Sequence, residues 1–177
     1  FIVEADEYDK SFLRINPYIS VISSLDLDHV DIYKNHDDLI LNFNIFLNKT
    51  ENMIISHENV LCDLKIKNKK IHAYDDIPHS ILNKQALKHI HLILPGKHNI
   101  ANLNAAVITC LSLGLKSKEI NNAICEFKGI LRRFQFHERE KFVLIEDYAH
   151  HPKEISATLN AVNKIYLNKK ITVFFQP

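Results

Sequence analysis

The chain has 177 residues, of which 46% are hydrophobic and 24% are charged, a composition that can bury a globular core. Its 22 basic and 21 acidic residues give a formal net charge of +1, which excludes a broad electrostatic footprint for nucleic acid or an anionic membrane. The three cysteines form no C-x-x-C pair, so we expect neither a disulfide framework nor a zinc site and predict a reducing, cytoplasmic environment.

The start and the hydropathy of the chain indicate neither secretion nor membrane insertion. The first residues, FIVEADEYD, lack the basic and apolar regions of a signal peptide. No window reaches the run of about 18 apolar residues that a membrane-spanning helix needs. We also expect both ends of the chain to cut through domains, because a strand predicted near the C-terminus would have few partners.

The N-terminal half is predicted to begin with a strand-loop-helix unit. The apolar runs at residues 1–5 and 18–25 are typical of buried strands. After Asp37 and Asp38, which can cap a helix, apolar residues recur with the 3.6-residue period of a one-sided helix. Residues 52–94 contain short β-like runs and are predicted to form a small β-rich insertion.

The remaining elements indicate a helical segment followed by a βαβ unit. Helices are predicted at residues 98–113, before Gly114, and from Ser117 onward. Gly129 ends this pattern, so we predict domains at 1–129 and 130–177. A strand at 142–146, a helix opened by Pro152 and a strand at 171–175 follow. The predicted fold class is α/β, with parts of two domains.

Two acidic motifs follow the first two predicted strands. Glu4 lies in VEADEYD and His29 in LDLDHVDIY, at strand ends where open α/β sheets bind ligands. Carboxylate oxygens suit Mg²⁺, and a neutral imidazole nitrogen can bind a metal. The alternatives are a solvated acidic turn and a surface histidine.

Two further motifs carry polar groups suited to a nucleotide. In GKHNIANLNAA, His98 and Asn102 lie four residues apart on one helical face and could contact a base edge, whereas Asn99 could equally cap the helix. In GILRRF, a guanidinium from Arg132 or Arg133 can bind phosphate oxygens through two hydrogen bonds. We expect one of the two arginines to be functional and the other structural.

The last motif, IEDYAHHP, joins a strand to a helix. Asp147 can accept hydrogen bonds from ribose hydroxyls, and the helix N-terminus favours an anionic substrate. The alternative for Asp147 and His150 is helix capping.

In this order, VEADEYDKSF, DLDHVDIY, GKHNIANLNAA, GILRRF and IEDYAHHPKE resemble the motif series of the Mur ligases, the bacterial enzymes that add amino acids to cell-wall precursors. The resemblance implies the later part of a P-loop-type central ATPase domain in 1–129, and the start of a Rossmann-like C-terminal domain in 130–177. It implies an ATP-dependent ligase that forms an amide bond through an acyl phosphate in peptidoglycan synthesis.

The resemblance also implies a role for each motif residue. Glu4 and His29 would hold Mg²⁺, with His29 and Arg133 acting in catalysis. The other implied contacts are with the adenine side of ATP (His98, Asn99 and Asn102), its phosphates (Arg133), its ribose (Asp147) and the acceptor substrate (Tyr148, His150 and His151). Glu4, His29, Arg133 and Asp147 are expected to converge on one metal-bound triphosphate.

Three departures from the family pattern qualify these roles. The glycine-rich P-loop is absent, because Gly96-Lys97 has no upstream glycine at the required spacing, so we expect no ATP turnover by this chain alone. We expect the family's N-terminal UDP-binding domain to be missing as well, as part of the same departure. Second, the helix LILNFNIFLNK offers no lysine at the expected carbamylation position, and Lys49 is not a candidate. Third, the sequence ends at FFQP, where the alanine-adding branch of the family is expected to continue into arginines that contact the muramate substrate.

Within the family, the chain is similar to the branch that joins L-alanine to UDP-N-acetylmuramate. The alternatives are the branch that recycles a murein tripeptide and a non-catalytic interaction module.

Overall fold

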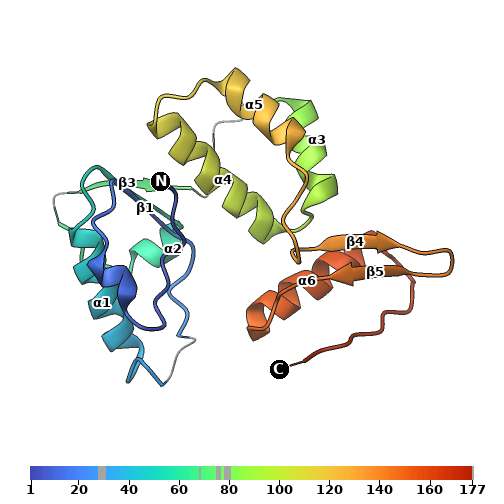
Figure 1. Ribbon diagram of the computed structural model, residues 1–177, viewed down its shortest axis with the longest axis horizontal. Helices are drawn as coiled ribbons and strands as arrows, with labels where there is room; N and C mark the ends of the chain where they lie inside the picture. The colour runs from blue at the N-terminus through green and yellow to red at the C-terminus, as the bar shows by residue number, and fades with distance from the viewer. Residues whose placement is uncertain (28–30, 68, 75–76, 78–80, 177) are drawn as a thin grey trace. The chain divides into compact units, whose positions relative to one another are not determined.

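The computed structural model describes residues 1–27, 31–67, 69–74, 77 and 81–176, and divides them into two compact units. Unit 1 comprises Phe1–Ile77 and Asn104–Leu113, and unit 2 comprises the described residues of 78–103 and 114–177 (Figure 1). In the described part of the chain, none of the helices combines the length and the apolar character that crossing a bilayer requires.

Unit 1 is organised around a three-stranded parallel sheet in the order β1-β2-β3. Its strands are β1 (Ile19–Ile22), β2 (Met53–Ser56) and β3 (Lys70–Ala73). All four residues of β2 are buried, because this strand has a neighbour on each side and is covered on both faces. The apolar run MIIS therefore forms the centre of the sheet.

Helix α1 (His36–Asn48) packs an aromatic cluster onto this sheet. Asn35 is its N-cap, because the Asn35 side chain accepts a hydrogen bond of 2.9 Å from the backbone N–H of Asp38. The Phe12 ring, in the short 3-10 helix η1 (Ser11–Arg14), lies 5.1 Å from the Phe46 ring of α1. The buried core of this cluster consists of Phe12, Ile22, Leu25, Phe46, Leu47 and Ile54.

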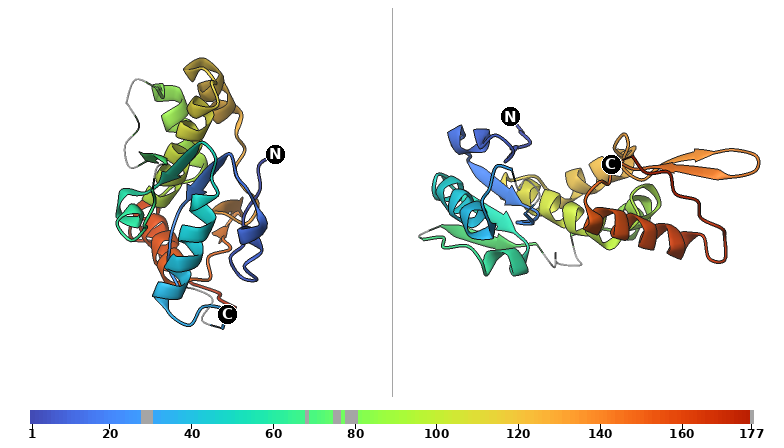
Figure 2. Two further views of the ribbon diagram at one scale, coloured as in Figure 1. Left: turned by 90° about the vertical axis from the view of Figure 1, so that its left-hand side faces the viewer. Right: turned by 90° about the horizontal axis from the view of Figure 1, so that it is seen from below.

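Unit 2 combines helices with a β-hairpin. Strands β4 (Gln135–Glu138) and β5 (Val143–Glu146) pair antiparallel, and α6 (Pro152–Ile165) lies along them (Figure 2). The small core between hairpin and helix contains Leu94, Phe134, Ala161 and Val162, with Phe136 and Ile145 packed against it.

The other helices of the described chain are α2 to α5. Helix α4 contributes residues to both units, since the boundary between units falls after Leu103. Gly114, just after α4, has a φ of +89°, the left-handed conformation predicted for a helix end. The bounds are α2 (Glu58–Leu61), α3 (Lys84–Ile93), α4 (Lys97–Ser112) and α5 (Ser117–Glu126).

The α/β class is confirmed, but several predicted strands are wrong. Residues 1–5 form no strand and are exposed, because no neighbouring strand pairs with them. Of the β-like runs in the predicted insertion, MIIS forms β2 and KIHAY contains β3, whereas VLCDLKI begins in α2 and most of HLIL lies in α3. Residues 171–175 are not in a strand, and β5 pairs with β4 in a hairpin instead of forming the predicted parallel βαβ unit.

Candidate functional site

The turn that carries the two adjacent arginines is fixed by the phenylalanine that follows them. Ile130 and Arg133 form an isolated antiparallel bridge, and Arg132 and Phe134 have φ values of +59° and +49°. This left-handed backbone is rare outside glycine and asparagine and needs support from tertiary contacts. Phe134, only 1% exposed, supplies that support from the core of unit 2. The aromatic residue of RRF is therefore an anchor.

The two arginines contact different partners. The Arg132 guanidinium lies 4.8 Å from the centre of the Tyr148 ring, and its Nε lies 3.6 Å from a carboxylate oxygen of Glu146. The Arg133 guanidinium instead lies 3.7 Å from the carboxylate of Glu154. Both arginines remain substantially exposed. Arg132 thus belongs to the end of the hairpin, and Arg133 faces the start of α6.

Asp147 ties this turn to the loop after β5. One carboxylate oxygen accepts a hydrogen bond of 2.8 Å from the Phe134 N–H, and the other accepts one of 2.9 Å from the Ala149 N–H. The Tyr148 N–H in turn donates to the Arg132 carbonyl at 2.7 Å. The carboxylate therefore organises two loops at once, while each oxygen keeps lone-pair capacity for a further donor.

The histidine pair forms the entrance to α6. His151 is the N-cap residue, and its Nδ1 accepts from the Lys153 N–H at 3.3 Å. Glu154 reaches back and accepts from the N–H groups of His150 and His151 at 3.3 and 3.4 Å, which completes a capping box. The capping role considered for Asp147 and His150 is thus carried by His151 and Glu154. The Tyr148 and His150 rings meet edge to face at 5.4 Å.

His98 shares the electrostatic environment of this cluster. Burial lowers the pKa of His98, the Arg133 charge lowers it as well, and the charges of Asp147 and Glu154 act in the opposite direction. The ring folds over Gly96, where a Cβ would lie 2.7 Å from the His98 Cε1 atom. Unit 2 therefore brings His98, Arg133 and Asp147, three residues predicted from separate motifs, into one region.

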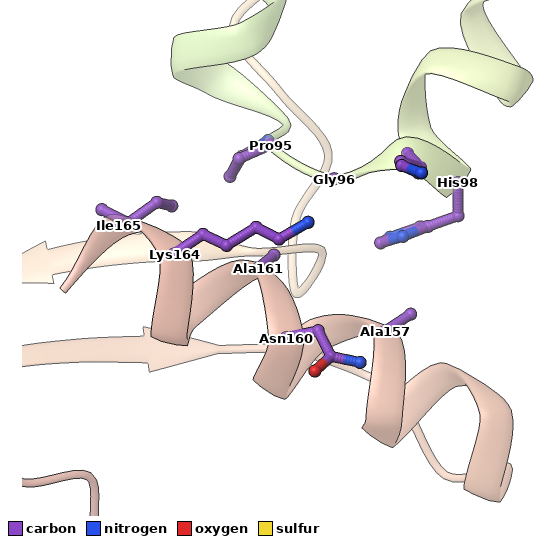
Figure 3. Close-up of a pocket in the computed structure, with 9 residues that line it drawn as sticks. Pro95, Gly96, His98, Ala157, Asn160, Ala161, Lys164 and Ile165 are labelled. Carbon is purple, nitrogen blue, oxygen red and sulfur yellow. The ribbon is translucent and has the colours of Figure 1, made fainter. Parts of the chain in front are cut away.

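An open groove of ≈ 570 Å³ begins at His98 and follows α6. Its floor is apolar, and the His98 ring and the Lys164 side chain extend into it from opposite sides (Figure 3). The groove is open to solvent along one side and combines apolar surface with a few polar groups. The groove is lined by Pro95, Gly96, Lys97, His98, Ala157, Asn160, Ala161, Lys164 and Ile165.

The two asparagines of the GKHN motif differ in their contacts. The Asn99 side chain donates to the Pro95 carbonyl at 3.0 Å and so stabilises the start of α4. Asn102 is exposed and lies in the same unit as His98. Its side chain is accessible to a ligand, whereas that of Asn99 already has a structural partner.

The acidic candidates of unit 1 form no metal site in the described part of the chain. Glu4 is exposed and precedes the first regular element, and His29 lies outside the described residues. Asp6 and Asp9 accept hydrogen bonds from the backbone N–H groups of Tyr8 and Ser11 at 2.9 and 2.8 Å. Hydrogen bonding from Ser11 lowers the pKa of Asp9. No group of three or more potential ligands occurs among the described residues.

The chain matches known proteins over nearly its whole length, although no family model matches it. It is 37% identical over 192 residues to a UDP-N-acetylmuramate–L-alanine ligase of Flavobacterium psychrophilum and 35% identical over 208 residues to one of Francisella philomiragia. Each alignment covers 99% of this chain. The chain spans 42% and 46% of the length of these two relatives.

Solved structures agree with these matches in fold. MurF from Acinetobacter baumannii has a TM-score of 0.60 at 15% identity and covers 90% of this chain and 39% of its own. A murein peptide ligase from Psychrobacter arcticus has a TM-score of 0.55 at 18% identity and covers 89% and 37%. The identity of 35 to 37% to the curated relatives, over 99% of this chain, confirms that the chain belongs to the Mur ligases, and the solved structures agree with the fold. Within that class, the curated relatives at 35 to 37% identity are named UDP-N-acetylmuramate–L-alanine ligase.

Proposed function

We propose that this chain provides nucleotide-contacting residues of a cytoplasmic, ATP-dependent ligase that joins L-alanine to UDP-N-acetylmuramate in peptidoglycan synthesis. The observation that carries the proposal is the 37% identity, over 99% of the chain, to a relative of that name. The occurrence of His98, Arg133 and Asp147 in unit 2, where the charges of Arg133 and Asp147 act on His98, supports it, since all three were assigned to ATP on independent motifs.

The proposed reaction has two chemical steps. A carboxylate oxygen of the acceptor attacks the γ-phosphorus of ATP, and ADP leaves. The amino group of L-alanine then attacks the carbonyl carbon of the acyl phosphate, and phosphate leaves as the amide forms. Positioning of the two reactants and neutralisation of phosphate charge are the contributions that protein side chains make to such a transfer.

The described residues suit these contributions. Arg133 is half exposed and makes an ion pair with Glu154 through one terminal nitrogen, so further N–H donors can reach phosphate oxygens. Asp147 can accept from a ribose hydroxyl in addition to its two backbone donors. Burial lowers the pKa of His98 and so favours its neutral form, which can donate from one ring nitrogen and accept at the other, as a base edge requires. Asn102 offers an exposed amide on the same helix.

The acceptor substrate is assigned to the loop that enters α6. Tyr148 and His150 are exposed there, and the N-terminus of a 14-residue helix favours a negatively charged group. His151 uses its Nδ1 for capping, so its Nε2 is the atom available for a substrate.

Glu4 and His29 remain the proposed magnesium ligands. The described residues near Glu4 do not by themselves fit a magnesium site, because no three-ligand group occurs among them. We therefore derive no reaction step through the metal.

The test uses the polypeptide encoded by the complete reading frame that contains this chain. We expect phosphate release that requires ATP, UDP-N-acetylmuramate and L-alanine together. Arg133→Met should reduce turnover by about tenfold or more, because a charge-assisted contact to phosphate is lost. Arg139→Met, which removes an exposed arginine of the hairpin, is the matched control and should leave turnover unchanged. Turnover with a tripeptide in place of L-alanine, or no ATP consumption with any acceptor, would reject the proposal.

A further inference from the structure

Glu154 contacts several of the segments to which function was assigned, although no motif role was given to it. One carboxylate oxygen lies 3.7 Å from the Arg133 guanidinium. The other accepts from the N–H groups of His150 and His151 at 3.3 and 3.4 Å and lies 3.8 Å from the His150 Nδ1 atom. Its charge also acts on His98. One side chain thus connects the arginine turn, the histidine loop and the first turn of α6.

The ion pair with Glu154 restricts the Arg133 side chain, which would otherwise be mobile. Arg133 is 46% exposed, and a long exposed side chain samples many rotamers in water. The turn below it is already fixed by Phe134 and by the hydrogen bond to Asp147. Among the described residues, Glu154 is the acidic group with which Arg133 forms an ion pair. The direction of the guanidinium therefore depends on this carboxylate.

Glu154 is unsuited to contact an anion itself, since a carboxylate repels phosphate. The N-terminus of α6 attracts anions, and an acidic residue three positions after the cap would weaken that attraction unless a cation neutralises it. Arg133 is that cation. The pair consequently places a guanidinium, with its remaining donors, beside the helix start.

We propose that Glu154 is a positioning residue that orients the Arg133 guanidinium toward the phosphates of ATP. This inference rests on the proposed function, because it takes Arg133 as the phosphate contact. The carboxylate does not touch the nucleotide. Its charge is the smallest of the influences on His98, so its main effect on nucleotide binding is through Arg133. Its effect on nucleotide affinity should disappear when Arg133 is removed.

The test compares Glu154→Gln, Arg133→Met and the double variant in the polypeptide encoded by the complete reading frame that contains this chain. Glutamine keeps an oxygen that accepts from the His150 and His151 N–H groups, so the capping contact is retained while the charge is lost. Nuclear magnetic resonance reports the guanidinium N–H signals of Arg133 and the dissociation constant for ATP. We expect Glu154→Gln to shift and broaden those signals and to weaken ATP binding by about two- to fivefold, the range of an exposed ion pair. In the Arg133→Met background, Glu154→Gln should have no further effect.

A matched control is available in α5. Glu119 accepts from the Lys116 N–H at 2.8 Å, a capping contact of the same kind, and forms no ion pair with an arginine among the described residues. Glu119→Gln should change neither the Arg133 signals nor the ATP affinity. Unchanged Arg133 signals in Glu154→Gln, or an equal loss of affinity with and without Arg133, would overturn the inference. If the unaltered complete polypeptide does not bind ATP but Glu154→Gln still releases the guanidinium, the nucleotide role fails while the positioning of Arg133 stands.

Discussion

The two units contain strands of similar sequence that end in different environments. In unit 1, MIIS forms β2, which has a parallel neighbour on each side and is fully buried. In unit 2, VLIE forms β5, which pairs with β4 alone and exposes Val143 and Leu144. An apolar run thus favours extended backbone in both cases, but the number of neighbouring elements decides how much of it is buried. Unit 1 is stabilised mainly by apolar packing, whereas the loops of unit 2 are fixed by polar contacts.

The largest expected effect tests this contrast between the two strands. Ile54→Ala, in β2, removes a side chain with 0% exposure and should lower the free energy of unfolding of unit 1 by about 2–5 kcal/mol. Leu144→Ala, in β5, removes a side chain that is 47% exposed and should cost unit 2 less than about 1 kcal/mol. Urea unfolding, followed through the amide signals of each unit separately, measures both values. Equal losses would show that burial does not distinguish the strands.

A smaller loss is expected when the polar contacts of unit 2 are removed. Asp147→Ala leaves the N–H groups of Phe134 and Ala149 without their acceptor and should lower the free energy of unfolding of unit 2 by about 1–3 kcal/mol. Asp147→Asn keeps one acceptor oxygen and should lose less. The same urea titration provides the measurement. If Asp147→Ala unfolds normally yet loses ATP affinity, the carboxylate serves the ligand and not the loops.

The elements with clear periodicity or capping signals could be predicted from the sequence. The period of 3.6 residues located α1, and the proline after the histidine pair located the start of α6. The run HLIL was misassigned, because most of it lies at the end of α3. The start of that helix is marked by Asn83, whose side chain accepts a hydrogen bond of 2.8 Å from the Ala86 N–H. Residues 1–5 were misassigned because strand formation depends on a partner that local sequence does not specify.

The sequence named candidate site residues, but it did not indicate the contacts between them. His98, Arg133 and Asp147 were named from three motifs, and the structure brings them into one unit. The hydrogen bond between Asp147 and the Phe134 N–H joins positions thirteen residues apart, so no local pattern indicates it. Glu154 was missed, although its spacing of three residues from His151 is the signature of a capping box.

Unit 1, which is stabilised mainly by apolar packing, also contains a buried polar contact at Tyr33. Tyr33 is 1% exposed, its hydroxyl donates to the Glu7 carbonyl at 2.7 Å, and the Lys10 ammonium lies 4.9 Å from its ring centre. Burial, reinforced by the negative charges of Glu7 and Asp38, raises the pKa of Tyr33 to about 12 from an ordinary value of 10.0. The folded state therefore keeps this proton at a pH where the unfolded state loses it.

The consequence is a loss of stability in alkaline solution. The contribution of Tyr33 is fully present below about pH 10 and is lost as the pH rises through about 12, by at most about 3 kcal/mol. Tyr33→Phe has no ionisable hydroxyl and should lack this component, whereas the titration of lysines is common to both proteins. The free energy of unfolding of unit 1, measured between about pH 9 and 12, gives the comparison. Parallel curves for the two proteins would contradict a buried, protonated Tyr33.

The smallest expected effect is a change in the pKa of His98, in unit 2. His98 should titrate below its ordinary pKa of 6.5, because burial and the Arg133 charge disfavour its protonated form. Removing the Arg133 charge with Arg133→Met should raise the pKa of His98, and removing the Asp147 charge with Asp147→Asn should lower it further. The stability linked to His98 is present above about pH 6.5 and decreases as the pH falls through its lower folded-state value. Ring proton shifts of His98 against pH give all three values. If the two variants changed the pKa of His98 in the same direction, His98 would not respond to both charges. The polar residues of unit 2 would then form two separate sets of contacts.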